Sequence, residues 1–195
     1  MSAVCHPPLS LRRGRVHEAC GPGAIGFAAA TCAAGQGQIL WIREGWRAES
    51  LNPVGLSAFF DPHRLLLAAT ANQTETLAVA EEALKDGAIP LVVLEITSAL
   101  DLREGRRLQL ASAAGRTTGL CLIPEGMGSN AAQTRWYCTS LAGTDRADST
   151  PMRWALIKNK SGTLGAWDVR WDHAARRLDM VPPVGERPGS ARAPG

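Results

Sequence analysis

The chain has 195 residues, of which 45% are hydrophobic and 20% are charged. This composition excludes a wholly disordered chain, a coiled coil and a collagen-like fibre, and it predicts one globular domain with a sizeable core. The net charge of +3 is too close to neutral to predict a dedicated nucleic-acid-binding protein.

The predicted elements alternate between strand and helix over the first two thirds of the chain. Apolar runs predict strands at Ile39–Ile42, Leu65–Ala69, Leu91–Ile96 and Leu120–Ile123, and VHEAC at Val16–Cys20 is a further short strand candidate. Helical propensity, helical spacing and end signals predict helices at Ala24–Ala34, from Asn72 to Gly87, and from Asp101 to Gly115. Such an alternation favours a parallel sheet covered by helices.

The pattern changes after residue 130, where strands follow one another directly. They are expected at Thr134–Thr139, Met152–Lys158, Ala166–Trp171 and Arg177–Val181, with a hairpin loop at Asp172–Ala175. We therefore expect an α/β fold, a three-layer αβα sandwich whose mainly parallel sheet gains antiparallel strands at its C-terminal edge. The domain spans residues 15–181, between a flexible N-terminal arm, 1–14, and a disordered Pro/Gly-rich tail, 182–195.

Targeting and metal signals are absent from the sequence. The longest apolar stretch, Leu91–Ile96, is about one strand long, far below the ~18 residues of a membrane span. The N-terminus places its charges after a short, weakly apolar run, which is the wrong order for a secretory signal. The five cysteines are scattered, with no CxxC pair, and the histidines show no ligand spacing. We expect a cytoplasmic protein with reduced thiols, no metal and no membrane contact.

A glycine-rich turn joins the first predicted strand to the first predicted helix. Gly21-Pro22-Gly23-Ala24-Ile25-Gly26 has the glycine spacing of a phosphate-binding loop, G-x-x-x-x-G. In such a loop the next two residues are Lys and Ser/Thr, but here they are Phe27 and Ala28. Without the cation and the magnesium-binding hydroxyl, we expect no nucleotide cofactor and no hydrolysis. An ordinary strand-to-helix turn is the alternative interpretation.

Four stretches in fixed order extend this pattern: HEACGPGAIG, ILWIRE, EEALKDGAIPLVVLEITSAL and KNK. Together they resemble the core of the RecA recombinase, which implies a RecA-like fold of the P-loop NTPase type. The resemblance places Glu44 at a catalytic acidic position and Glu95 at a magnesium-linked one. Because the loop has lost its chemistry, we interpret both acids as vestigial. Their structural alternative is a solvated acid or an acid paired within the core.

The C-terminal part of the pattern suggests a surface for a protein partner. Lys158 and Lys160 match a basic pair that RecA proteins present to the nucleotide of a neighbouring subunit. Trp167 and Trp171 alternate along one predicted strand and therefore share a face. Lys158, Asn159, Lys160, Trp167 and Trp171 form our candidate partner interface. For the tryptophans, packing in the core is the alternative.

A closer resemblance covers residues from about 15 to 178. Its phrases are VHEACGP, LNPVGL, DPHRLLL, AEEALKDGA, RRLQLA, SNAAQTRW and KNKSGTLGAWDVRWD. In this order they are similar to ImuA, a RecA-like, SulA-related family of inducible mutagenesis proteins. The resemblance implies a non-catalytic adaptor in damage-induced (SOS) mutagenic translesion DNA synthesis. Its partners would be an ImuB-like Y-family protein, an error-prone replicative-type polymerase and RecA.

Two other functions stay open at this point. The relation to SulA implies a cell-division inhibitor that binds FtsZ. An atypical NTPase would use Glu44 and Glu95 without the loop lysine, with Lys158 or Lys160 of a neighbouring subunit as the replacement cation. RecA-like filaments need an additional N-terminal helix and strand, and only about 14 residues precede the first strand here. We therefore do not expect polymerisation in the RecA manner.

The segment that RecA uses to hold DNA is short in this chain. It reads Pro124–Ser129 and carries one acid and no base. DNA binding gains its affinity from basic contacts that release counter-ions, so we expect little or no direct DNA binding through this segment. The remaining basic candidates are Arg12–Gly14 and the pair Arg106–Arg107, for which a charged helix face is the alternative.

Overall fold

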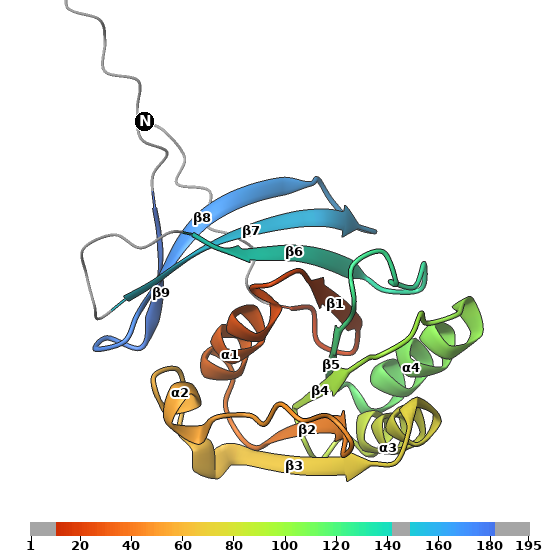
Figure 1. Cartoon of the computed structure of the whole chain (residues 1–195). Helices are drawn as coiled ribbons and strands as arrows, with labels where there is room; N and C mark the ends of the chain where they lie inside the picture. Colours follow the sequence, from red (N-terminus) through yellow and green to blue (C-terminus); the bar gives the residue numbers. More distant parts are fainter. Residues whose placement is uncertain (1–10, 142–148, 182–195) are drawn as a thin grey trace, which may run out of the picture.

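One mixed sheet organises the molecule (Figure 1), and the computed structural model describes residues 11–141 and 149–181. Within these residues the strands are β1 (Val16–Cys20), β2 (Ile39–Glu44), β3 (Leu65–Thr70), β4 (Leu91–Glu95), β5 (Thr118–Leu122), β6 (Thr134–Ser140), β7 (Ser149–Asn159), β8 (Gly165–Asp172) and β9 (Arg177–Met180). The helices are α1 (Ala24–Ala34), α2 (Pro53–Ser57), α3 (Gln73–Asp86) and α4 (Leu102–Gly115), with a 3₁₀ turn at Pro62–Arg64. The predicted tail, 182–195, and residues 1–10 of the predicted arm lie outside the described residues.

The strand order confirms the predicted α/β class. It is β3-β2-β4-β5-β1-β6-β7-β8-β9. All neighbours from β3 to β6 are parallel, and those from β6 to β9 are antiparallel. The sheet is therefore mainly parallel and gains antiparallel strands at its C-terminal edge, as the sequence predicts.

Helices cover both faces of the parallel part. α1 and α2 share one apolar core with the sheet, and α3 and α4 share a second core on the opposite face. The antiparallel strands bend around α1 (Figure 1), and Val169 and Trp171 of β8 join its core. α1 therefore packs against both the parallel and the antiparallel strands, and most of its residues are buried.

The predicted helix starts are confirmed by their caps. The side chain of Asn72 accepts a hydrogen bond from the backbone N–H of Glu75, at 3.0 Å. Asp101 and Glu104 form a reciprocal capping box at the start of α4. Such caps satisfy backbone N–H groups that the first helical turn leaves without partners.

Short helices in the connection from β2 to β3 were not predicted. Each begins at a proline that follows a polar residue: the Asn52 side chain accepts from the N–H of Val54, and that of Asp61 from the N–H of His63. The sequence shows Asp61-Pro62 as a turn signal, and the structure extends it into a single 3₁₀ turn. β7 begins at Ser149, three residues before its predicted start, because it pairs with β8 as far as Asp172.

Candidate functional site

The glycine-rich loop between β1 and α1 lies directly against the backbone of β6. The N–H of Gly23 donates to the carbonyl of Cys138 at 2.8 Å. A Cβ atom on Gly21 would lie 2.6 Å from that same carbonyl oxygen, and one on Gly23 would lie 2.9 Å from the nitrogen of Thr139. Both glycines are therefore needed for the close approach to β6. Gly21 also has a φ of 86°, which favours glycine.

The two residues after the loop point into the core. Phe27 and Ala28 are both 0% exposed. The Phe27 ring centroid lies 5.3 Å from that of Trp136 and 4.9 Å from that of Trp154. A phosphate-binding loop needs a lysine and a hydroxyl that reach the ligand, whereas these side chains fill space between α1 and the antiparallel strands. Pro22 is exposed, and Gly26 approaches the sulfur of Met152.

Glu95, at the end of β4, is a paired acid. One carboxylate oxygen accepts from the indole N–H of Trp41 at 2.9 Å. The other forms ion pairs with Arg47 at 3.2 Å and with Arg43 at 3.6 Å. The residue is only 5% exposed. Since a buried carboxylate needs charge compensation and hydrogen bonds, this set accounts for Glu95 without a metal ion.

Glu44, at the end of the neighbouring strand β2, is also buried and hydrogen-bonded. It accepts from the hydroxyl of Thr97 at 2.6 Å and from the indole N–H of Trp46. For both vestigial acids, the structure therefore shows the core-paired alternative. Within residues 11–141 and 149–181, no three His, Cys, Asp or Glu side chains form a group that could hold a metal ion.

A cavity of about 430 Å³ lies beside these acids, between α1, α2 and the ends of β2 and β4. Its lining includes Gly26 and Phe59, and its charged groups are Arg43, Arg47, Glu49 and Glu95. The two guanidinium groups pair with the two carboxylates of the lining. The cavity is large enough for a small ligand, but its positive charge is already compensated. A polyphosphate would find no free cation in its wall.

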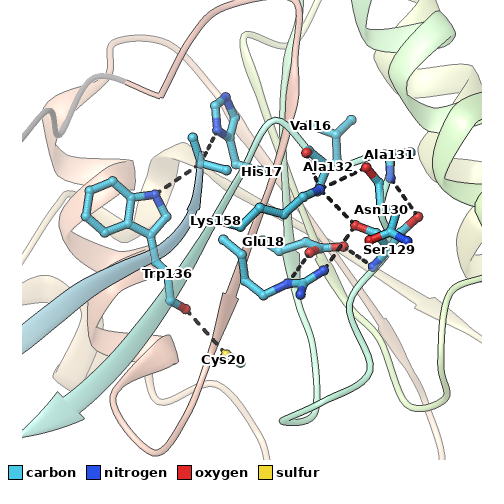
Figure 2. Close-up of polar contacts among 12 residues, drawn as sticks. Val16, His17, Glu18, Cys20, Ser129, Asn130, Ala131, Ala132, Trp136 and Lys158 are labelled. Atoms are coloured by element: carbon cyan, nitrogen blue, oxygen red, sulfur yellow. Dashed lines mark hydrogen bonds and ion pairs between the residues drawn. The ribbon is translucent and has the colours of Figure 1, made fainter. Parts of the chain in front are cut away.

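Lys158 is engaged by its own chain (Figure 2). Its ammonium donates to three backbone carbonyls of the β5–β6 connection: Ser129 at 3.2 Å, Asn130 at 2.9 Å and Ala132 at 2.7 Å. Partial burial, together with the charge of Lys160, lowers the pKa of Lys158. An ammonium has three donors, and all three are used here. Lys158 therefore has no free donor for a neighbouring subunit.

The rest of the KNK stretch has local roles as well. Lys160 donates to the carbonyl of Ala131 at 2.7 Å. The Asn159 side chain closes the β7–β8 turn, where its amide donates to the Thr163 carbonyl and its oxygen accepts from the Ser161 N–H. Asn159 pairs with Thr134 at the start of β6, whereas the glycine-rich loop contacts Cys138 further along that strand. The structure does not bring KNK and the loop together.

A buried polar cluster on β1 was not predicted. Glu18 is 1% exposed, and its two oxygens accept from the N–H of Ser129 and the guanidinium of Arg135, each at 2.7 Å. Arg135 also donates to the Ser129 carbonyl at 3.0 Å. With Lys158, these residues fix the β5–β6 connection against the sheet (Figure 2). The signal in the sequence was the acid in the middle of the strand predicted at Val16–Cys20; in the structure all five residues of that strand are buried.

His17 belongs to the same strand and is neutral. Its Nδ1 lies 2.6 Å from the Thr134 hydroxyl, and its Nε2 lies 3.1 Å from the Arg12 carbonyl. A carbonyl only accepts, so Nε2 carries the proton and Nδ1 accepts from Thr134. The Thr134 oxygen in turn accepts from the indole N–H of Trp136 (Figure 2). Burial lowers the pKa of His17 to about 4.

Trp171 and Trp167 pack inside the chain. Trp171 is 3% exposed; its indole N–H donates to the carbonyl of Ala58 at 2.9 Å, and its ring stacks on Phe59. Trp167 is half-buried, 5.8 Å from the Trp136 ring. Of the two alternatives for these tryptophans, the structure shows core packing. Trp171 offers no open surface in this chain.

The described cysteines are free and buried: Cys20, Cys32, Cys121 and Cys138. Burial raises the pKa of each thiol, for Cys32 to about 12. A cysteine attacks as its thiolate, so these four are poor nucleophiles at neutral pH. Cys5 lies outside the described residues.

A comparison with models of known protein families finds no match, and a comparison with curated proteins finds no similar sequence. No helix in the described part of the chain is long and apolar enough to cross a membrane.

Proposed function

We propose that the protein is a non-catalytic, RecA-like accessory protein of damage-induced mutagenic translesion DNA synthesis. The burial of Phe27 and Ala28 carries this proposal. At the two positions where a phosphate-binding loop needs a cation and a hydroxyl, this chain has core side chains that hold α1 against the antiparallel strands. The loop is thus a structural element that keeps the spacing of a catalytic one.

The surroundings of the loop support a role without catalysis. Glu44 and Glu95 are occupied by hydrogen bonds and ion pairs, and Lys158 is occupied by backbone carbonyls. An NTPase needs a free cation at the phosphates and a free acid at the magnesium. We therefore assign no nucleotide cofactor to this chain and keep the atypical NTPase only as an outcome of the test.

The pathway and the partners come from the sequence resemblance to ImuA. They are an ImuB-like Y-family protein, an error-prone replicative-type polymerase and RecA, with little or no direct DNA binding. A chain with a well-formed sheet, in which Glu44, Glu95 and Lys158 are all held by other groups of the described residues, suits an adaptor, which acts by holding partners together.

The test is the frequency of ultraviolet-induced mutation in a strain that lacks the gene, compared with its parent. We expect induced mutations to disappear while spontaneous ones remain, and a plasmid copy of the gene to restore them. A Glu44→Gln copy should restore them equally well at matched protein levels, because no hydrolysis is involved.

Other results would remove the proposal. Unchanged induced mutagenesis contradicts it, and blocked division with filamentous cells on overexpression would then assign a SulA-like role with FtsZ. Restoration by the wild-type gene but not by Glu44→Gln, together with ATP turnover by the purified protein, would assign the atypical NTPase.

A further inference from the structure

An open hollow of about 690 Å³ lies between α4 and the β5–β6 connection, away from the loop and the acids. One wall is the outer face of α4, where Leu102, Arg106 and Leu110 follow one another at four-residue spacing. The opposite wall contains Arg15, Asn130 and Lys160. We call this hollow the α4 groove. Side chains four residues apart share one face of a helix, so the wall of α4 forms one continuous stripe.

The stripe on α4 exposes apolar surface. Leu102 is 54% exposed and Leu110 is 72% exposed, whereas Leu108 on the same helix is 2% exposed and belongs to the core. A single exposed leucine is normal in a soluble protein. Two on the same helix face, beside a hollow, form the kind of apolar contact that a protein partner buries.

The charged groups of the groove all have the same sign. Among the described residues, its lining contains Arg15, Arg106 and Lys160 and no acidic residue. Within the described residues, Arg106 has no carboxylate partner, although the adjacent Arg107 pairs with Glu81. Of these two neighbours, Arg107 therefore forms a surface ion pair, and Arg106 lines the groove. An uncompensated cluster of cations attracts an acidic partner.

The groove is built on fixed elements. Gln109 of α4 forms two hydrogen bonds with the backbone of Val16, at 2.8 and 3.3 Å. Ser129, at the start of the opposite wall, donates from its hydroxyl to the carbonyl of Asp101. Lys158 also holds this connection (Figure 2), and Lys160 donates to the carbonyl of Ala131 within it. A preformed groove binds a partner without an ordering cost of its own.

We propose that the α4 groove docks an acidic amphipathic helix of a partner protein. Apolar anchors on that helix would cover Leu102 and Leu110, which lie about 12 Å apart along α4 at 1.5 Å per residue. Its carboxylates would pair with Arg15, Arg106 and Lys160. This inference rests on the proposed function only in that both require a protein partner.

A nucleic acid fits the same groove less well. Three cations would release few counter-ions, with a salt slope of about −2.7 on DNA. The part of the lining that the structure describes contains no aromatic side chain on which a base could stack. Phosphates would also leave both leucines uncovered. The observations therefore favour a protein helix, and nucleic-acid binding becomes an outcome of the test.

The experiment is a fluorescence-anisotropy titration of the full-length protein with a labelled peptide of about 16 residues. The peptide is designed as an amphipathic helix, with leucines at four- and three-residue spacing and glutamates beside them. We expect saturable binding at physiological salt. Arg106→Glu and Leu110→Ser should each weaken it about tenfold or more, the loss typical of an interface anchor.

The controls use other exposed residues, which do not line the groove. Arg103→Glu reverses a charge on the exposed surface of the same helix, and Leu164→Ser removes a leucine that is 62% exposed in the β7–β8 turn. Both should bind the peptide as the wild type does. A peptide with lysine in place of glutamate should not bind.

The proposal is overturned by no saturable binding, by binding that the two groove variants leave unchanged, or by equal binding of the lysine peptide. Binding of a labelled oligonucleotide that is lost in Arg106→Glu, with no binding of the acidic peptide, would assign the groove to nucleic acid instead. The mutagenesis test stays separate. Loss of induced mutation on deletion, without peptide binding, removes the groove and leaves the proposed function. Peptide binding with unchanged mutagenesis removes the proposed function and leaves the groove as a docking site.

Discussion

Phe27 lies between two indole rings, and this position decides how the loop can be tested. A lysine there would place an ammonium against Trp136 and Trp154, with no carboxylate among its ring neighbours. An unpaired buried charge costs several kcal/mol. Restoring the residues of a phosphate-binding loop by Phe27→Lys and Ala28→Thr is therefore expected to unfold the protein rather than to create ATP binding.

The measurable form of this prediction is Phe27→Ala. Removing a fully buried phenylalanine leaves a cavity and costs about 3–5 kcal/mol of unfolding free energy. Urea denaturation followed by tryptophan fluorescence measures the loss. Ile25→Ala, on the same helix but 46% exposed, should change the free energy by less than about 1 kcal/mol. Equal effects of the two substitutions would contradict the placement of Phe27.

His17 makes stability depend on pH. The unfolded chain takes up its proton near pH 6.5, whereas burial lowers the pKa of folded His17 to about 4. Between these values the unfolded state holds more protons, so stability falls as the pH falls from 6.5 to 4. We expect this group to remove about 2 kcal/mol of unfolding free energy between pH 7.5 and pH 5.

Urea denaturation at both pH values tests this dependence. A His17→Gln variant has no imidazole to protonate. Between pH 7.5 and pH 5 it should therefore lose about 2 kcal/mol less unfolding free energy than the wild type. If wild type and variant lose the same stability on acidification, His17 is not the group responsible. Thr134 should be left unchanged in both proteins, since its hydroxyl donates to the ring.

At the scale of elements, the two edges of the sheet differ. β9 carries Arg177 and Asp179, charges that discourage pairing with another strand. β3 has no charge, and within the described residues it pairs only with β2. The Thr70 carbonyl accepts from Gly45, so by alternation the backbone groups of Leu67 face the open edge. The Leu67 side chain is 56% exposed.

The uncharged edge strand β3 predicts self-association at high protein concentration. Leu67→Lys places a charge on the edge, and we expect it to reduce the concentration-dependent increase in light scattering without lowering the melting temperature. Leu164→Lys is the matched control, because that leucine is similarly exposed but lies in a turn. An equal reduction by both variants would point to net charge, not to the β3 edge.

Patterns of neighbouring residues were enough to predict most helices and strands, but not the buried polar contacts between them. The run Leu91–Ile96 and the caps of α3 and α4 depend on neighbours in sequence, which is why they could be placed. Glu18 and Arg135 are 117 positions apart, and no local rule joins them. The same holds for Lys158, whose donors are used by a connection that the sequence presents only as a loop.

At the scale of the whole molecule, the order of strands in the sheet differs from their order in the chain. β2, β3 and β4 follow one another in the chain, and β2 pairs with both of the others. β1 stands apart from them, between β5 and β6. The candidate site depends on this arrangement. The loop after β1 packs against β6, which follows more than a hundred residues later in the chain.

This strand order determines when each strand can pair during synthesis of the chain. β1 is synthesised before the other described strands, but both strands that pair with it follow about a hundred residues later, which is about 5 to 20 seconds at ordinary translation rates. During that time β2 can pair with β3 and with β4, although β4 still lacks its second neighbour, β5. β1, with its buried acid and histidine, therefore gains its sheet neighbours later than β2 and β3 do, although it is synthesised before them. A nascent chain halted before β6 would expose α1 on the face that the tryptophans later cover.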